Sequence, residues 1–393
     1  MTTAAPDTLL GLFLRFTRFG LLAWGGPVAQ IAMIRSELVD EQQWVTPARF
    51  NRLLAVYQAL PGPEAHELCV HFGMIRRGRL GGIAAGLGFM TPGLLLILGL
   101  AWAYRQLDLS QPPLPALFLG IQIAVVALIV RAVHRIGEHV LGDRWLWGIA
   151  LGSAAAALAG ISFWVLLGAG GLVYLFAGKG QFALVALVIV SAIGLAALTL
   201  TGSGPAGVAV AGGQSEASAG ALLLSGLKAG LLTFGGAYTA IPFVRGDAVG
   251  RGWVSDGQFL DGLALSGIIP APLIIFATFV GFQAGGLAGA LAMTAGIFLP
   301  AFGFSLLFFE RLERVVEDER VHRLLEGIAA AVVGLIAATA FDVARSVAGE
   351  VPALLPAVLI FAAVLALLCA WTSKYAVLAV LPLAAAAGFV AFG

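Results

Sequence analysis

The strongest constraint on the fold is a series of landmark residues that occurs twice, about 210 residues apart. Each half contains a double glycine, then a tryptophan, then two prolines separated by one residue. The double glycine recurs from Gly25-Gly26 to Gly235-Gly236, the tryptophan from Trp44 to Trp253, and the proline pair from Pro61-Gly62-Pro63 to Pro270-Ala271-Pro272. A spacing this constant over such a length indicates an internal duplication, so each half is expected to fold as a copy of the other.

The chain is too apolar for a soluble protein of its length. Of its 393 residues, 60% are hydrophobic and 11% are charged, and the mean hydropathy is +0.99. Apolar runs of about 20 residues, the length that crosses a bilayer as a helix, recur from one end to the other. We therefore predict an all-α, polytopic membrane protein surrounded by lipid, with no removable signal peptide.

Composition also excludes several classes of partner. The net charge of +1 provides no broad basic face for nucleic acid. The two cysteines, Cys69 and Cys369, lie far apart in apolar runs and make neither a structural disulfide nor a metal site. We expect no cofactor and no bound metal.

About thirteen apolar segments can be drawn, six on each side of a single extra segment. They lie near residues 8–33, 49–75, 80–104, 115–138, 144–160, 161–178, 181–201, 219–244, 257–283, 286–309, 321–345, 351–370 and 374–392. The predicted organisation is a first repeat over residues 1–180, a connecting helix and loop over 181–217, and a second repeat over 218–393. Because an odd number of segments precedes the second copy, the two copies should be inverted in the membrane.

Positive charge gives a separate test of this inversion, because Lys and Arg are enriched in cytoplasmic loops. The thirteen-segment arrangement places most of these residues on one face: Arg76, Arg77, Arg79, Arg131, Arg135, Arg144, Lys179, Arg245, Arg251, Arg311, Arg314, Arg320, Arg323 and Lys374. The other face receives Arg35, Arg49, Arg52, Arg105 and Arg345. This asymmetry predicts a cytoplasmic N-terminus and a C-terminus on the opposite side.

Two cations within the predicted segments occupy matching positions in the duplication. Arg18 lies seven residues before Gly25, and Lys228 lies seven residues before Gly235. A cation at the middle of a bilayer costs about 2.5–3.5 kcal/mol on insertion scales, so it tends to persist where it has a partner or a task. Both side chains could instead extend to a nearby interface. Their symmetry favours a pair of cations that face a central anion site.

The glycines and prolines interrupt helices at membrane depth, and the exposed backbone there must face protein or a water-filled cavity. New half-helices beginning at Pro63 and Pro272 would present free N–H groups and the positive end of the helix dipole, although simple kinks are the alternative. We predict a midplane binding site for a tetrahedral oxyanion at these breaks. Its expected residues are Arg18, Gly25, Gly26, Pro27, Gln58, Pro61, Gly62, Pro63, Lys228, Gly235, Gly236, Tyr238, Pro270 and Pro272.

Titratable side chains follow only the first proline pair. Glu64 would lie in the first turn of the new helix, where an acid suits the dipole, and His66 titrates near neutral pH. The second copy has Leu273, Ile274 and Ile275 after its own pair. Glu64 and His66 are therefore candidates for proton coupling, with helix capping by Glu64 as the alternative.

At these residues the sequence resembles the chromate ion transporter (CHR) superfamily in its long-chain, two-repeat form. The matching motifs cover most of both halves: Phe19-Gly20, Gly25-Gly26-Pro27 with Ala29, Trp44, Gln58-x-x-Pro61-Gly62-Pro63-Glu64-Ala65, Gly73, Pro92, Thr233-Phe234-Gly235-Gly236-Ala237-Tyr238, Gly252-Trp253, Gln258-Phe259-Leu260, Pro270-Ala271-Pro272 and Gly296-Ile297-Phe298-Leu299-Pro300. The resemblance implies a bacterial inner-membrane protein that exports chromate, with sulfate as a look-alike substrate, and thirteen spans in inverted halves. Trp24 and Gln30 stand where the family usually has Phe and His.

The sequence contains no Gly-x-x-x-x-Gly-Lys-Ser/Thr loop for ATP, so transport would be secondary. A dianion leaving a negative interior gains roughly 4.6 kcal/mol per 100 mV, so export needs no other energy source. We predict a transporter that exports chromate, with sulfate or related oxyanions as further substrates, and not an enzyme. An uptake carrier for sulfate or another anion remains open, as does a homo-oligomeric state. A membrane-embedded enzyme is the third hypothesis, but no cofactor motif or nucleophile–His–acid set supports it.

Overall fold

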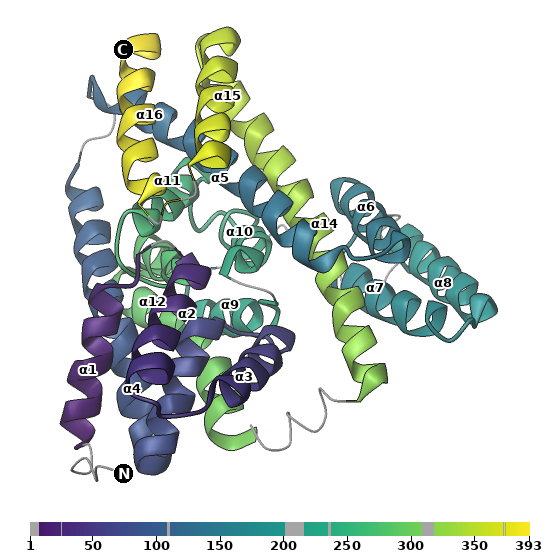
Figure 1. Cartoon of the computed structure of the whole chain (residues 1–393). Coiled ribbons are helices and arrows are strands. Elements are labelled where there is room, and N and C mark those ends of the chain that lie inside the picture. The colour runs from purple at the N-terminus through teal and green to yellow at the C-terminus, as the bar shows by residue number, and fades with distance from the viewer. Residues whose placement is uncertain are drawn as a thin grey trace.

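A computed structural model describes residues 8–24, 26–107, 111–200, 216–234, 237–308, 318–371, 373 and 375–393. Every regular element in these residues is a helix, as predicted (Figure 1). The first half contains α1 (Leu9–Leu21), α2 (Gly26–Arg35), η1 (Ser36–Glu41), α3 (Pro47–Ala59), α4 (Glu64–Gln106), α5 (Leu114–Val140), α6 (Arg144–Leu158), α7 (Phe163–Ala177) and the extra helix α8 (Phe182–Leu200). The second half contains α9 (Ala219–Leu231), η2 (Ala237–Ala240), α10 (Ile241–Ala248), α11 (Asp256–Gly267), η3 (Leu273–Ile275), α12 (Phe276–Gly303), η4 (Phe304–Phe308), α14 (Glu319–Glu350), α15 (Leu354–Ala370) and α16 (Ala376–Phe392).

The duplication is visible in the backbone. The long helix α4 is two helices joined by a sharp turn, because Arg77 (φ −142°, ψ 28°) and Gly78 (φ 60°, ψ −157°) leave the helical conformation. Helix α12 turns in the same way at Gly285 (φ −137°, ψ 21°) and Gly286 (φ 64°, ψ −154°). Glycine at the second position of both turns accommodates the positive φ without a steric penalty. The two turns also follow the duplication: Gly78 and Gly286 are separated by the same number of residues as Gly73 and Gly281.

Glycines also let the two arms of each turn pack closely. A Cβ added to Gly73 would meet the carbonyl oxygen of Gly81 across the turn in α4. A Cβ added to Gly281 would meet the carbonyl oxygen of Gly289 across the turn in α12. Small residues at a helix–helix contact allow the backbones to approach each other, as is common in membrane proteins.

The broken segments fold back on themselves. Arg18 in α1 forms an ion pair with Glu37, which lies 19 residues later, beyond α2. A straight continuation at about 1.5 Å per residue would separate these residues by roughly 28 Å, so α2 must return alongside α1. In the second copy, the Nζ atom of Lys228 in α9 lies 2.5 Å from Oδ1 of Asp247 in α10. The cation and the acid of this pair both keep the register of the double glycines, so the two ion pairs are equivalent in the duplication.

This folding corrects the predicted position of the loop that carries Arg35, Arg49 and Arg52. The prediction puts that loop on the face opposite Arg76. In the structure, the guanidinium carbon of Arg76 lies 4.8 Å from the ring centre of Trp44, which belongs to the same loop. A hydrocarbon core of about 30 Å cannot separate two groups in contact, so the loop and Arg76 lie at the same end of the molecule.

The equivalent loop of the second copy needs the same correction. The prediction puts Arg245 and Arg345 on opposite faces. In the structure, Arg245 Nε lies 2.8 Å from a carboxylate oxygen of Asp256, and the hydroxyl of Ser346 donates to the same carboxylate at 3.3 Å. Arg245 therefore lies at the end of the molecule where α14 ends.

Equivalent helices of the two copies run in opposite directions. Gly82, near the start of the second arm of α4, lies beside Leu306 at the end of the α12 segment. Arg105, at the end of the same arm, lies 5.4 Å from the ring centre of Phe282, before the turn in α12. The second arms of α4 and α12 are thus antiparallel, and the N- and C-termini lie at opposite ends of the view (Figure 1). This is the inverted arrangement that the parity of segments predicts.

The long helices α5 and α14 join the copies crosswise. Helix α5 packs against α15 and α16 of the second copy, while α14 packs against α6 and α7 of the first. The two long helices also pack against each other, and α14 crosses the middle of the molecule next to α5 (Figure 1). The last two helices of each copy therefore dock on the long helix of the other.

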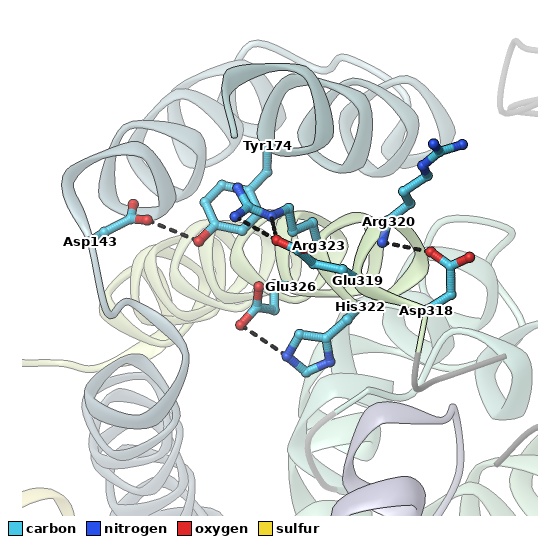
Figure 2. A network of polar contacts seen from close by, with 8 residues as sticks. All are labelled: Asp143, Tyr174, Asp318, Glu319, Arg320, His322, Arg323 and Glu326. Carbon is cyan, nitrogen blue, oxygen red and sulfur yellow. Dashed lines mark hydrogen bonds and ion pairs between the residues drawn. The ribbon is translucent and has the colours of Figure 1, made fainter. Parts of the chain in front are cut away.

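One polar contact joins the start of α6 to α7, and others lie within the first turns of α14 beside them (Figure 2). The carboxylate of Asp143 accepts two backbone N–H groups of the first turn of α6 and the hydroxyl of Tyr174 at 2.9 Å. Desolvation acts to raise the pKa of Asp143, but these donors and the charge of Arg144 outweigh it and lower the pKa overall. Arg323, which lies beside Tyr174 in this view, pairs with Glu319 one turn away on α14 at 3.0 Å.

The described residues form a polytopic membrane protein. Four segments are long and apolar enough to cross a bilayer: Glu64–Gln106, Leu114–Val140, Leu273–Phe308 and Glu319–Glu350. Shorter apolar helices accompany them. Large apolar side chains such as Leu95 and Trp102 are exposed on the outer surface, as expected for contact with lipid.

Candidate oxyanion site at the broken helices

The broken segments meet in two pairs, and each pair joins one copy to the other. At the first junction, Nε2 of Gln30 donates to the carbonyl oxygens of Ala23 (3.0 Å) and Ala271 (3.1 Å). At the second junction, the N–H of Gly62 donates directly to the carbonyl oxygen of Thr233 (2.8 Å). In the register of the duplication, Ala23 corresponds to Thr233 and Gly62 corresponds to Ala271. The same two positions therefore meet at both junctions.

A cavity of about 440 Å³ lies against the first junction. Its walls come from both copies. The first copy contributes the break before α2, α2 itself and the second half of α5. The second copy contributes Tyr238, the end of α11 with the break that follows it, and the link between α15 and α16. The lining residues are Ala23, Trp24, Gly26, Pro27, Ala29, Ala32, Val125, Leu128, Ile129, Arg131, Ala132, Arg135, Tyr238, Leu263, Ser266, Gly267, Ile269, Ala271, Leu273, Leu368, Trp371, Ser373, Ala376, Val377 and Leu378. None of them is acidic.

Two arginines give this cavity its charge. Arg131 and Arg135 lie one turn apart on the same face of α5, and both line the cavity. Neither forms an ion pair with an acidic side chain of the described residues. Two uncompensated guanidinium groups in a largely apolar cavity attract a small anion, and each can present several donors to one oxyanion.

Neutral donors supplement these charges. Helix α2 begins at Gly26 on the cavity wall, and the first N–H groups of a helix have no acceptor within it. The Tyr238 side chain also lines the cavity. A helix start, a phenol and two guanidinium groups together are suited to the charge and the several acceptor atoms of a tetrahedral oxyanion.

The structure brings together some of the sequence-predicted site residues. Gly26, Pro27 and Tyr238 line the cavity, and Pro270 and Pro272 are buried on either side of the lining residue Ala271. The predicted residues of the first proline pair lie elsewhere: Pro61, Gly62 and Pro63 belong to the second junction, and Gln58 is exposed at the end of α3. Gly25, Gly235 and Gly236 lie outside the described residues.

Arg18 and Lys228 do not line this cavity. The Arg18 side chain is 58% exposed and bonds Glu37, while the Lys228 side chain is 19% exposed and bonds Asp247. The Lys228 ammonium also lies 5.2 Å from the ring centre of Phe163. Each cation thus has an acidic partner from the returning half of its own broken segment.

The site residues predicted from the sequence do not include Arg131, Arg135, Glu37 or Asp247. The arginines lie near the end of a predicted segment, where a cation ordinarily extends to the interface. The acids carried a usable signal, because Glu37 and Asp247 share the offset of Arg18 and Lys228. That register identifies two equivalent ion pairs without any coordinates.

The other titratable candidates lie at the second junction. Glu64 is 7% exposed, and His66 is fully buried with its ring 4.9 Å from that of Phe298 and 4.8 Å from that of Phe302. Pro63, which precedes Glu64, caps the helix without any side-chain hydrogen bond. Within the described residues, no group of three or more His, Cys, Asp or Glu side chains could hold a metal ion.

Comparison with known proteins places this arrangement in a family. The chromate transporter family profile matches residues 10–175 and 220–389, once in each half. The chain is 60% identical over 388 residues to the chromate transport protein of Pseudomonas aeruginosa, which covers 98% of this chain and 93% of that protein. It is 30% identical over 370 residues to the chromate transport protein of Cupriavidus metallidurans, or 92% of this chain and 89% of that one.

A shorter relative matches only part of the chain. The uncharacterized transporter YwrB of Bacillus subtilis is 33% identical over 134 residues, which is 34% of this chain and 67% of YwrB. No solved structure shows a significant match. The chain therefore belongs to the chromate transporter family, a family of membrane transporters rather than enzymes.

Proposed function

We propose that this protein is a secondary transporter that exports chromate across the bacterial inner membrane. The observation that carries the proposal is the cavity at the first junction, with two arginines that have no acidic partner among the described residues. The relatives from Pseudomonas aeruginosa and Cupriavidus metallidurans are named chromate transport proteins, and this supports chromate as the substrate.

In this proposal the substrate sits between Arg131, Arg135, the start of α2 and Tyr238. Chromate and sulfate are both tetrahedral dianions, so charge and shape discriminate little between them. We therefore expect sulfate to compete with chromate for the same cavity. Of the residues expected from the sequence, Gly26, Pro27 and Tyr238 would contact the anion directly, while Pro270 and Pro272 would hold the opposite wall.

Arg18 and Lys228 have a supporting role in this proposal. Each holds the two halves of a broken segment together through its acid, and this fixes the break next to which the anion binds. Their replacement would then affect transport through the shape of the site rather than through lost charge at the anion.

The basic residues support a cytoplasmic N-terminus. After the correction of the loops, Arg35, Arg49 and Arg52 join Arg76, Arg77 and Arg79 at the N-terminal end of the molecule. At the other end, the described residues retain a smaller set: Arg105, Arg245, Arg251 and Arg345. The positive-inside rule then assigns the N-terminal end to the cytoplasm.

The membrane potential favours export. One charge crossing the membrane is worth about 2.3 kcal/mol per 100 mV, so a dianion gains roughly 4.6 kcal/mol when it leaves a negative interior. Uptake of sulfate or another anion is the alternative, and it needs a coupled ion. Flux into and out of proteoliposomes at a set potential distinguishes the two: a negative cytoplasmic side accelerates outward movement of the dianion without any coupled ion, whereas uptake against this potential requires a gradient of the coupled ion.

The central test is flux of chromate in proteoliposomes for Arg131→Gln and Arg135→Gln. We expect each variant to lose at least about tenfold, which corresponds to about 1.4 kcal/mol of lost anion stabilisation. Arg79→Gln is the matched control, because Arg79 is an exposed arginine away from the cavity. Wild-type flux in the double variant Arg131→Gln/Arg135→Gln would contradict the proposed site. Cells that express the wild-type protein should also accumulate less chromate than cells without it.

A further inference from the structure

The second junction contains a carboxyl group that the cavity does not explain. Glu67 is fully buried, and neither oxygen of its carboxyl has a hydrogen-bond partner among the described residues. The group points back into the break, because a Cβ added to Gly62 would lie 2.6 Å from its Oε1 atom. Gly62 is also the residue that donates to Thr233 of the second copy. The carboxyl therefore occupies the contact between the two copies.

An ionised carboxylate is not stable in this position. An unpaired ion that is removed from water costs several kcal/mol unless a cation or hydrogen-bond donors compensate for it. Helix capping would supply backbone N–H donors, but none reaches the carboxyl of Glu67. In this conformation Glu67 therefore carries a proton, and it can lose the proton only when the junction opens to water.

The same helix and its partner in the second copy supply no compensating charge. Glu64, one turn earlier on α4, is a second buried acid and supplies no positive charge. The ring of His66 packs against Phe298 and Phe302 instead, and its two nitrogens also have no partner among the described residues. Elements α12, η3 and η4 carry no titratable side chain at all.

None of the titratable groups on the other elements packed against α4 bonds the carboxyl of Glu67. In α3, the Tyr57 hydroxyl lies 3.1 Å from Nδ1 of His71, one turn beyond Glu67, while Arg49 and Arg52 are exposed near the start of that helix. In α1, Arg18 is bonded to Glu37, as described above, and Arg15 donates to the side chain of Gln42.

Two further elements complete these surroundings. In α11, Asp261 accepts hydrogen bonds from Tyr104 (2.7 Å) and Gln122 (3.0 Å). Helix α2 carries only Arg35, which faces Asp40 at 4.0 Å. None of these groups therefore bonds the Glu67 carboxyl within the closed junction.

The two acids that follow the first proline pair have no acidic counterpart in the second copy. Glu64 and Glu67 correspond to Leu273 and Phe276 in the second copy, in the register of the proline pairs. The first junction has arginines and a cavity, while the second has acids and is closed. In transporters with inverted repeats, alternating access rocks one repeat against the other, so a movement that opens one junction closes its counterpart.

We propose that Glu67 is a proton-binding site whose occupancy is linked to oxyanion binding at the first junction. Closing the second junction moves one proton from water to the Glu67 carboxyl, and opening the junction returns it to water. This inference rests on the proposed function, because it takes the cavity to be the anion site. If the anion prefers the conformation described here, anion binding draws protons from solution, and by reciprocity a lower pH tightens anion binding.

The test uses the purified full-length protein in detergent, with sulfate as the probe because its charge is constant between pH 6 and 9. Calorimetric titration in buffers of different ionisation enthalpy counts the protons taken up per anion. We expect an uptake of up to one proton for wild type and none for Glu67→Gln. The apparent Kd of wild type should weaken by up to tenfold per pH unit on the alkaline side, while that of Glu67→Gln stays flat.

Three comparisons make the result decisive. Glu216→Gln removes an exposed carboxylate and should behave as wild type. Glu67→Asp keeps a carboxyl and should keep proton uptake, which also preserves the test if Glu67→Gln fails to fold. A wild-type proton count of zero, or the same count in Glu67→Gln as in wild type, would overturn the inference.

Two other outcomes are distinguishable from these. If wild type binds neither sulfate nor chromate, the proposed function fails rather than the proton site. If replacing sodium by choline changes the Kd while pH does not, the second junction takes a metal cation, and the proton assignment is overturned.

Discussion

The two junctions occupy equivalent positions in the duplicated fold, yet they have opposite chemistry. Ala23 meets Ala271 at the first, and Thr233 meets Gly62 at the second. Beside the first junction lie a cavity and two arginines without acidic partners among the described residues. At the second junction, the carboxyl of Glu67 is buried and has no hydrogen-bond partner among the described residues. The same two positions of the duplication therefore meet at both junctions, through the Gln30 side chain at the first and directly at the second, while the surrounding side chains have diverged.

This difference suggests how a protein with two equivalent repeats can transport a substrate in one direction. Two identical junctions would bind the same ligand in both conformations of the protein. An anion-attracting junction opposite an acidic one makes the two conformations energetically distinct, because each stabilises a different charge. The ion pairs Arg18–Glu37 and Lys228–Asp247, by contrast, are retained in both copies and hold the folded-back segments in place.

The largest expected effect comes from making the first junction resemble the second. Leu273 lines the cavity and corresponds to Glu64, so Leu273→Glu transfers an acid to the anion site. Two like unit charges 4 Å apart repel by about 4 kcal/mol at an effective dielectric constant of 20, and half of that energy lowers binding roughly 30-fold. We expect chromate flux to fall by at least that factor. Leu273→Gln, which has a similar shape without the charge, should retain most of the flux; an equal loss in both variants would show that charge is not the cause.

The next effect separates the two equivalent ion pairs. Lys228→Gln leaves Asp247, which is 8% exposed, with only the longer contact to Arg251 at 3.5 Å, and we expect a loss of about 2 kcal/mol of folding free energy. Arg18→Gln should cost less than about 1 kcal/mol, because the arginine is 58% exposed and screened by solvent. Thermal denaturation in detergent measures both. Lys228→Gln/Asp247→Asn should recover part of the loss, and equal losses in the two single variants would contradict the burial argument.

Replacing the glycines at the helix turns should affect the two copies alike. Gly73→Val and Gly281→Val would each drive a side chain into a neighbouring carbonyl group, at a cost of about 2 kcal/mol. Gly99→Val is the control, since a Cβ there meets nothing within 4 Å. The expected result is a similar fall in the thermal midpoint for the first two variants only. A fall in one copy alone would show that the copies differ in packing as well as in chemistry.

The smallest effect concerns the N-terminal ends of α6 and α15. Asp143 caps α6, whereas its counterpart in the second copy, Ala353, precedes α15 without a side-chain cap. Asp143→Ala should cost about 1 kcal/mol at neutral pH, and Ala353→Asp should stabilise the protein by a similar amount. Because the folded pKa of Asp143 is lowered, its contribution is present above the unfolded pKa and disappears as the pH falls through the folded value. Thermal midpoints of wild type and Asp143→Ala should therefore converge in acid; a constant difference would contradict this.

Much of the architecture could be predicted from sequence because its signals are local. Apolar runs, double glycines and proline pairs mark helices and breaks one by one, and each predicted segment corresponds to described helices. The fold-back of the broken segments could not be predicted, because a straight helix and a hairpin can have the same apolar composition. The inversion of the copies survives this error, because two segments of each copy fold back: two predicted crossings are removed together, and the parity of the remaining segments is unchanged.

The candidate site was less predictable, because it depends on contacts between distant elements. Gly26, Pro27 and Tyr238 were selected from the break motifs, and the structure places all three on one cavity. Arg131 and Arg135 become cavity residues only because α15 and α16 of the other copy pack beside α5. No pattern within residues 115–138 carries that information. Substrate contact by Arg18 and Lys228 stays a prediction from the sequence, because each bonds an acid away from this cavity.

The crosswise docking of the terminal hairpins has an evolutionary consequence. Because α5 packs against α15 and α16, and α14 packs against α6 and α7, each of these two helices is covered by helices of the other half. In a half expressed alone, the covered face of α5 or α14 would be exposed to the bilayer unless a second polypeptide packed against it. Fusion of the two halves into one polypeptide ensures that they are always produced in equal amounts. It also allows the two halves to diverge in sequence while they stay associated.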